Sequence, residues 1–316
     1  MSTKEDFKVL KDCTVITEKD PRLDDPSFAH ETPLQLDGIR RDIMYLDEEV
    51  APAFFYNEYM WHMPGKAQPQ SSVELKSAAP HTSPYDKVIS FVGTNKDNLY
   101  DLCGNVEVVL NGQVFDLTRC FAVYIPAGMV HSVTVKRVDR PIWQYVLGHG
   151  KRFEAVPAEM PKADPTADLG KQFSYSYGQG FDLPDYRKGG GPNDTPGRHD
   201  HITLMNEQMV PEAQFYIEAS WLGPGPRAPL PPGVKHAGPK RHVHPFPELI
   251  TYFGTNWDDL YDLAGHVYLT LEDIEFDITQ SFVVYIPENV PHCPLYLEEI
   301  PNRMVHFTAG PVGVYV

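Results

Sequence analysis

A tandem duplication constrains the fold of this chain more than any other feature of its sequence. Residues 81–145 align with residues 242–306 at a constant offset and without a gap. The identical runs include Gly-Thr-Asn, Leu-Tyr-Asp-Leu and Val-Tyr-Ile-Pro, which begin at Gly93, Leu99 and Val123 in the first copy. About half of the aligned positions are identical, and self-similarity of this extent indicates one structural unit built twice. We therefore expect two domains of the same fold.

The domain boundaries follow from the repeat and from the segments that precede each copy. The chain has 316 residues, which suits two domains of ordinary size. A long segment without a counterpart precedes each repeated region. We assign residues 1–160 to the first domain, with 1–37 as a lead-in arm, and residues 161–316 to the second domain. Segments of this kind are usually linkers, arms or pocket lids.

Short runs of β-branched and aromatic residues, separated by turn residues, predict strands through both copies. In the second copy we expect strands over 249–253, 266–271, 274–278 and 281–286. In the first copy, Asn111-Gly112 separates two such runs and is a strong hairpin signal. Helical periodicity is scarce, and 30 prolines with 23 glycines suit a chain with many corners. The expected class is all-β, with each domain a sandwich or barrel.

The two copies differ in the residues that could bind a metal ion. The second copy contains His242, His244 and Glu248 in close succession, and His292 follows a proline-braced turn. Side chains two residues apart on a strand share a face, so the first three should point into one cavity. His292 can complete the set from another strand. Three imidazoles and one carboxylate suit Mn²⁺ or Fe²⁺ best, with Ni²⁺, Cu²⁺ and Zn²⁺ feasible. We predict one divalent transition metal ion per chain.

The first copy has lost part of this set. The matching positions are His81, Ser83, Lys87 and His131. A hydroxyl thus replaces one imidazole, and an ammonium replaces the carboxylate. Because an ammonium repels a divalent cation, the sequence predicts a degenerate first site that binds no metal.

The ligand pattern resembles the two signature motifs of the cupin superfamily. The resemblance lies in H-x-H, a glutamate four residues later, a glycine after the next strand, and a proline turn that ends in a histidine. A chain with two copies is similar to the bicupins. The resemblance implies two tandem cupin-like jelly-roll β-barrels, a metal held by the second, and a homodimer or higher homo-oligomer. Asn289 stands where the motif usually has a turn glycine, and asparagine tolerates the left-handed backbone of such a turn.

Other residues of the second copy are candidates for catalysis or for lining the pocket. His306 and Tyr252 are the predicted acid–base residues. His306 aligns with Tyr145 of the first copy, and a tyrosine cannot serve as a base near neutral pH. Aromatic side chains are expected to line the pocket, although aromatic residues in a barrel are often plain core. These are Phe215, Trp221, Phe246 and Tyr285.

An open-sided site of three histidines and one glutamate admits more than one function. Such a metal can polarise an oxygen-chelating substrate as a Lewis acid and can also bind O₂. The first hypothesis is a dioxygenase that cleaves a C–C bond of a small oxygenated molecule, aromatic compounds included. The alternative is a redox-neutral lyase, decarboxylase, hydrolase or isomerase on the same scaffold. A third class is a non-catalytic binding or storage protein. The ligands alone do not separate these functions.

Charge and composition limit the partners that we expect. The formal net charge is −16, which argues against nucleic acid and anionic membrane surfaces. No apolar run approaches a membrane span, and the first residues are polar rather than an apolar leader. The four cysteines show no paired spacing. We therefore expect a cytoplasmic protein whose partner is a small-molecule substrate, with no nucleic acid and no membrane.

Overall fold

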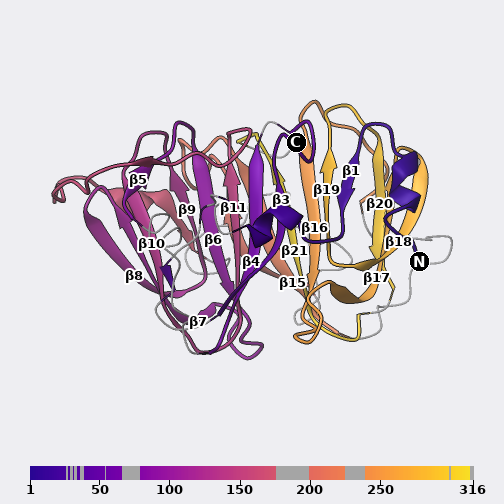
Figure 1. The fold of residues 1–316 in the computed structure, drawn as a ribbon, viewed down its shortest axis with the longest axis horizontal. Helices are drawn as coiled ribbons and strands as arrows, with labels where there is room; N and C mark the ends of the chain where they lie inside the picture. Colours follow the sequence, from indigo (N-terminus) through magenta and orange to yellow (C-terminus); the bar gives the residue numbers. More distant parts are fainter. Residues whose placement is uncertain are drawn as a thin grey trace. The chain divides into compact units, whose positions relative to one another are not determined.

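The two copies of the repeat fold as two separate units in the computed structural model (Figure 1). One unit contains Lys19–Ser176 and Met209–Ala213, and the other contains Met1–Glu18, Tyr177–Gln208 and Gln214–Val316. The structure describes residues 1–25, 28, 31, 34–35, 39–53, 55–65, 79–175, 199–224, 239–298 and 300–313.

These units differ from the predicted domains of residues 1–160 and 161–316. Residues 1–18 of the predicted lead-in arm belong to the second unit, and residues 161–176 belong to the first. Within the rest of the predicted arm, residues 26–27, 29–30, 32–33 and 36–37 lie outside the described residues.

The first unit contains two sheets that share one core. Residues of both sheets, such as Phe91, Val108 and Val135, form a single buried cluster. The strands of one sheet are, in order, β13 (Phe173–Tyr175), β9 (Phe121–Ile125), β6 (Lys87–Gly93), β11 (Ile142–Gly148), β4 (Tyr56–Met63) and β3 (Ile39–Leu46). The strands of the other are β12 (Val156–Pro157), β5 (His81–Thr82), β10 (His131–Val138), β7 (Asp101–Leu110) and β8 (Gln113–Arg119), with β2 (Leu34–Gln35) also paired to β10.

The second unit repeats this arrangement with a smaller second sheet. Its core cluster joins residues of both sheets, including Ile250, Leu269 and Met304. The strands of the large sheet are β1 (Thr14–Ile16), β19 (Phe282–Ile286), β16 (Glu248–Gly254), β21 (Met304–Gly310), β15 (Tyr216–Leu222) and β14 (His199–Met205). The strands of the small sheet are β18 (Ile274–Gln280), β17 (Asp262–Leu271) and β20 (His292–Leu297).

The all-β prediction is confirmed, and each unit has the two facing sheets expected of a cupin-like jelly roll, antiparallel except at the β2–β10 pair. The described helices are short 3₁₀ turns: η1 (Asp6–Val9), η2 (Pro21–Asp24) and η3 (Leu169–Gln172). No helix among the described residues has the length and apolar character needed to cross a membrane.

The predicted hairpin at Asn111-Gly112 is confirmed. Both residues have positive φ, 43° and 84°, as the tight turn between β7 and β8 requires. The matching turn between β17 and β18 is made by Glu272 and Asp273, at φ 51° and 71°. Asn289 also adopts the left-handed backbone that was expected, with φ 60°.

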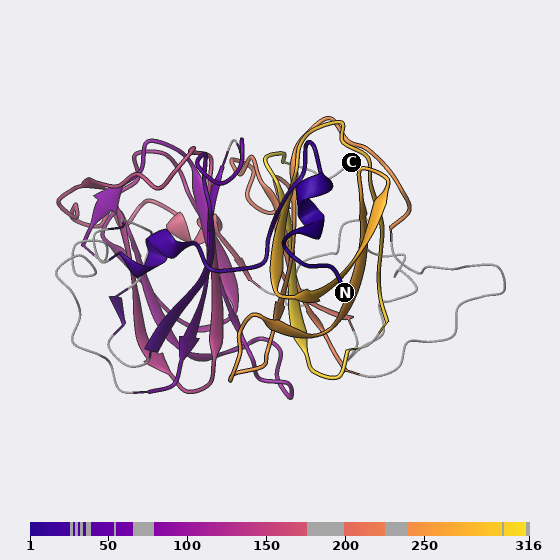
Figure 2. The same cartoon turned by 45° about the vertical axis from the view of Figure 1, so that its right-hand side comes forward.

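The N-terminal residues extend the large sheet of the second unit (Figure 2). Strand β1 pairs antiparallel with the edge of β19. The Glu272 carboxylate accepts backbone hydrogen bonds from Lys11, Asp12 and Cys13 at 2.8–2.9 Å, and Phe7 packs on Phe276 with ring centroids 5.1 Å apart. An unpaired edge strand exposes backbone donors and acceptors, which β1 satisfies here. In the first unit β13 covers the edge of β9 in the same way.

Candidate metal centre

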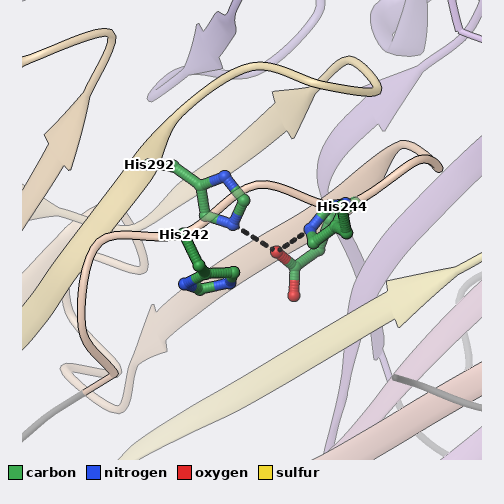
Figure 3. Close-up of side chains that lie close together, drawn as sticks. His242, His244 and His292 are labelled. Atoms are coloured by element: carbon green, nitrogen blue, oxygen red, sulfur yellow. Dashed lines mark hydrogen bonds and ion pairs between the residues drawn. The ribbon is translucent and has the colours of Figure 1, made fainter.

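Four side chains of ligand type meet in the second unit where the two sheets approach each other. Glu248 is the first residue of β16 in the large sheet, and His292 is the first residue of β20 in the small sheet. His242 is bridged to His292 by two backbone hydrogen bonds of 3.1 and 3.2 Å. One ligand atom each from His242, His244, Glu248 and His292 lies within 4.8 Å of all the others (Figure 3). The structure therefore brings the four predicted ligands together.

His244 reaches this cluster from an irregular segment and not from a strand. The expectation that His242 and His244 share one face of a strand is wrong, because only the single bridge at His242 is strand-like. Pro245 and Pro247 follow, and proline has no N–H to donate to a neighbouring strand. The His244 ring instead stacks on Phe246, with centroids 4.2 Å apart. Phe246 thus contacts a predicted ligand, as a pocket-lining residue should.

Each of the three imidazoles is oriented by a backbone carbonyl at its Nδ1 atom. A carbonyl only accepts, so Nδ1 carries the proton and Nε2 retains its lone pair. This is how metal-binding histidines are commonly held, since the fixed tautomer aims Nε2 at the ion. The acceptors for His242, His244 and His292 are the carbonyls of Lys240, Phe246 and Val290, at 2.7, 2.6 and 2.9 Å.

The Glu248 carboxylate faces two of these imidazoles. Its Oε2 atom lies 3.2 Å from His244 Nε2 and 3.1 Å from His292 Nε2 (Figure 3). Burial alone would raise the pKa of Glu248, but its contacts with His244 and His292 lower that pKa to about 2. The contact with Glu248 also raises the pKa of His292, against the effect of burial. A divalent cation fits these donors.

Thr308 is a functional residue that the sequence analysis missed. Its hydroxyl donates to Glu248 Oε1 at 3.0 Å, so it holds the oxygen that does not face the histidines. Thr308 lies on β21, opposite Ile250 of β16. The residue in the matching register of the first unit is Val146, opposite Ile89. The loss of this hydroxyl in the copy without Glu248 was a usable signal, although the aligned segment stopped short of it.

A second carboxylate lies on the strand next to Thr308. Glu218 of β15 is the cross-strand partner of Thr308 and is 3 % exposed. The Tyr216 hydroxyl donates to Glu218 Oε2 at 2.6 Å, and His201 Nδ1 lies 2.5 Å from Glu218 Oε1. The sequence signal for this group was a glutamate inside an otherwise mostly apolar strand. We name Tyr216, Glu218 and His201 the carboxylate–histidine group.

The predicted catalytic residues His306 and Tyr252 lie together, further along the sheet. Their rings stack with centroids 4.4 Å apart, and His306 Nδ1 donates to the Thr251 carbonyl at 2.9 Å. Tyr252 is four residues beyond Glu248 on β16, or about 13 Å along the strand. Their catalytic role stays a prediction.

The strand register corrects the alignment of His306 with Tyr145. His306 pairs with Tyr252, and in the first unit Gln144 pairs with the matching Phe91. The structural counterpart of His306 is therefore Gln144 and not Tyr145.

Two of the predicted pocket-lining residues lie on the wrong face of the large sheet. Tyr285 pairs with Leu249, and Trp221 pairs with Val305. Neighbours along a strand point to opposite faces, so this register places both aromatic residues away from Glu248. The prediction that Trp221 and Tyr285 line the pocket is wrong. Phe215 precedes β15 and is fully buried, and its role stays a prediction.

The positions of the predicted degenerate site also come together, in the first unit. Lys87 begins β6 as Glu248 begins β16, and His131 begins β10 as His292 begins β20. His81 pairs with His131, and Ser83 is buried nearby in the chain. The structure adds a residue that the sequence analysis did not include. Glu31 of the lead-in arm forms a group of potential ligands with His81 and His131.

Comparison with known proteins yields solved structures only. No family model matches the chain, and no curated protein sequence matches it. A mutant oxalate decarboxylase of Bacillus subtilis aligns over 92% of this chain and 77% of its own, with 12% identity and a TM-score of 0.48. The oxalate decarboxylase of Lactobacillus farciminis, in a formate complex, aligns over 92% of this chain and 85% of its own, with 14% identity and a TM-score of 0.48. Similarity at this level carries no information on substrate or activity.

Proposed function

We propose that the chain is a metal-dependent enzyme of the cupin type, with one divalent transition metal bound by the second unit. The ligands are His242, His244, Glu248 and His292, and Mn²⁺ or Fe²⁺ suits them best. The observation that carries the proposal is that hydrogen-bond acceptor atoms of Glu248, His244 and His292 face one another at one buried point. Glu248 Oε2 lies about equally far, 3.2 and 3.1 Å, from two Nε2 atoms whose Nδ1 partners are backbone carbonyls. Such a buried group of lone pairs needs a cation at its centre.

The arrangement around the ligands suits a Lewis-acid site. When bound, the metal would polarise an oxygen atom of a chelating substrate at the positions that the four protein ligands leave open. Thr308 holds Glu248 Oε1 and so fixes which oxygen faces the histidines. Phe246 stacks on His244 and covers one side of it with an apolar ring.

For the reaction, we favour redox-neutral chemistry over the dioxygen-dependent cleavage that the sequence suggested first. A decarboxylase, lyase or isomerase must deliver or remove a proton at carbon, and it needs a positioned acid or base to do so. The carboxylate–histidine group offers one, because Glu218 lies opposite Thr308 and contacts both His201 and Tyr216.

The test is metal analysis followed by a substrate screen with and without air. The protein is purified anaerobically, its metal content is measured, and small hydroxy acids, keto acids, enediols and catechols are offered. We expect turnover without O₂ and no O₂ uptake at an oxygen electrode. Uptake of one O₂ per turnover would establish the dioxygenase instead. Protein that binds no divalent metal at all would overturn the proposal.

A variant of the carboxylate–histidine group separates the reaction class from metal binding. Glu218→Gln should leave the metal content unchanged while lowering kcat by about a hundredfold, the usual scale for a lost general acid or base. The matched control is Glu58→Gln, at the same position of β4 in the first unit, where no effect on kcat is expected. Equal activity of Glu218→Gln and the parent protein would remove this group from the mechanism.

A further inference from the structure

The first unit contains a buried ion cluster at the place where the second unit has its candidate metal ligands. Lys87 is fully buried, and its ammonium donates to Glu31 Oε2. The Lys87 Nζ atom also lies 3.5 Å from His81 Nε2. Glu31 Oε2 lies 3.2 Å from His81 Nε2, and Glu31 Oε1 lies 3.5 Å from His131 Nε2. One charged amine therefore lies among a carboxylate and two imidazoles.

The two imidazoles of this cluster keep the geometry of their counterparts in the candidate metal centre. The rings of His81 and His131 have centroids 4.3 Å apart at 60°. Those of His242 and His292 are 4.3 Å apart at 64°. Backbone carbonyls again accept from Nδ1, which leaves both Nε2 atoms for the centre. For His81 and His131 these are the carbonyls of Ala79 and Met129, both at 2.9 Å.

The carboxylate that the sequence predicted to be missing is supplied by the lead-in arm. Glu31 is 3 % exposed, and its backbone N–H donates to Glu58 Oε1 at 2.7 Å. Burial would raise the pKa of Glu31, but the charges of Lys87 and His81 hold it well below its usual range. Burial and the neighbouring ammonium lower the pKa of His131 to about 4. His131 is therefore a neutral acceptor at physiological pH.

We propose that the ammonium of Lys87 takes the place of a metal ion in the first unit. We further propose that Glu31, His81 and His131 form a latent site for a divalent transition metal, which binds only when this ammonium is removed. Two histidines and one glutamate are a donor set that binds Zn²⁺ with a position left open. Their ligand atoms already lie within 4.8 Å of one another. Lys87 blocks the site because its Nζ atom contacts both Glu31 Oε2 and His81 Nε2, and a second cation there would be repelled at short range.

The experiment removes the ammonium and measures metal. Lys87→Met keeps the length and apolar stem of the side chain and deletes its charge. His292→Ala is combined with it to weaken metal binding by the second unit, and the metal content is compared with that of His292→Ala alone. After loading with Zn²⁺ or Co²⁺ and dialysis, His292→Ala alone is the reference, and His292→Ala/Lys87→Met should hold one equivalent of metal more than this reference. Adding Glu31→Gln to the second variant should abolish that equivalent.

Thermal unfolding gives a second readout that needs no activity. Lys87→Met without metal should unfold at a lower temperature than the parent, because Glu31 is left buried without its cation. Zn²⁺ should restore that temperature in Lys87→Met but not in Lys87→Met/Glu31→Gln, whose cluster has lost the carboxylate. If Lys87→Met folds only when Zn²⁺ is present, the latent site is supported.

Three outcomes would overturn the proposal. Metal bound by His292→Ala and lost on adding Glu31→Gln would mean that a divalent ion coexists with Lys87. A folded His292→Ala/Lys87→Met protein that holds no more metal than His292→Ala would mean that the three side chains are not competent ligands. Lys87→Met that stays unfolded with Zn²⁺ would mean that the metal cannot take the place of the ammonium.

Discussion

The contact between Thr308 and Glu248 makes a sharp test of the candidate metal centre. The Thr308 hydroxyl donates to Glu248 Oε1 at 3.0 Å, while Oε2 faces His244 and His292. Thr308→Val deletes the donor and keeps the branched shape of the side chain. The carboxylate can then rotate, and its oxygen is no longer held in place for the ion.

The size of the effect follows from the kind of hydrogen bond that is lost. A hydrogen bond to a charged group contributes about 1.5–3 kcal/mol. If this contribution acts on the metal-bound state, the affinity falls by roughly 10- to 150-fold, in line with the 10- to 100-fold typical of lost supports of metal ligands. We therefore expect Thr308→Val to bind Mn²⁺ or Zn²⁺ about 10- to 100-fold more weakly than the parent.

The assay is a competition titration against a chromophoric chelator, with circular dichroism to confirm the fold. The matched control is Thr251→Val. The Thr251 hydroxyl is buried and, like that of Thr308, donates to an oxygen, the Phe307 carbonyl at 3.2 Å, but it lies on the face of β16 opposite Glu248. Equal affinities of Thr308→Val and the parent would refute the reasoning, as would an equal loss in Thr251→Val.

Three further predictions concern the same unit. His292→Ala should remove most of the bound metal while the sheets stay folded, as measured by metal analysis and circular dichroism; full retention of metal would make the ligand assignment wrong. If His306 moves a proton, His306→Gln should lower kcat by about a hundredfold at unchanged metal content, whereas parent-like kinetics in both His306→Gln and Tyr252→Phe would place the acid–base group elsewhere. In metal-free protein, the pKa of Glu248 is lowered from 4.5 to about 2, so its stabilisation is complete above pH 4.5 and is lost as the pH falls toward 2. The raised pKa of His292 adds stability that is complete below pH 6.5 and is lost as the pH rises through the folded-state pKa. Urea unfolding from pH 2 to 8 measures how the free energy of unfolding depends on pH in both ranges, and Glu248→Gln should weaken each dependence.

Local patterns in the sequence were sufficient to predict most of the strands. β16, β18 and β19 match the expected runs to within two residues at each end, because alternation and β-branched residues determine where a strand can lie. β17 begins four residues earlier than expected, at Asp262. Its first part contains Ala264, whose positive φ of 50° marks an irregularity that an alternating pattern does not reveal.

A gap-free alignment could not give the register of the last strand. β11 begins at Ile142 and β21 at Met304, whereas their preceding strands begin at His131 and His292. The connection is therefore one residue longer in the second unit, which shifts every later match by one. A shift of one residue turns each side chain to the other face of the sheet. This is why a gap-free alignment matches His306 with Tyr145, whereas the strand register matches it with Gln144.

The sequence could not predict the contact of Glu31 with the cluster in the first unit, for a different reason. Glu31 meets His81 and Lys87 from about fifty residues away along the chain. It comes from an arm that has no repeated counterpart, so neither periodicity nor the duplication indicates where it lies. Contacts of this kind depend on how the whole unit closes. The same holds for residues 1–18, which pair with β19 of the second unit.

In both units a buried carboxylate needs a positive charge beside it, and the two units supply that charge in different ways. Imidazoles with their Nδ1 protons committed to carbonyls present lone pairs to a buried centre, and a buried carboxylate adds negative charge there. Without a cation this arrangement is unstable, because a buried charge with no partner costs several kcal/mol. In the second unit Glu248 is part of the strand, so the cation must come from solution. In the first unit the same position carries Lys87, so the cation is covalently attached and the carboxylate must come from elsewhere, which is what Glu31 provides. Lys87 and Glu31 therefore depend on each other, since either one alone would leave a buried charge without its ion-pair partner.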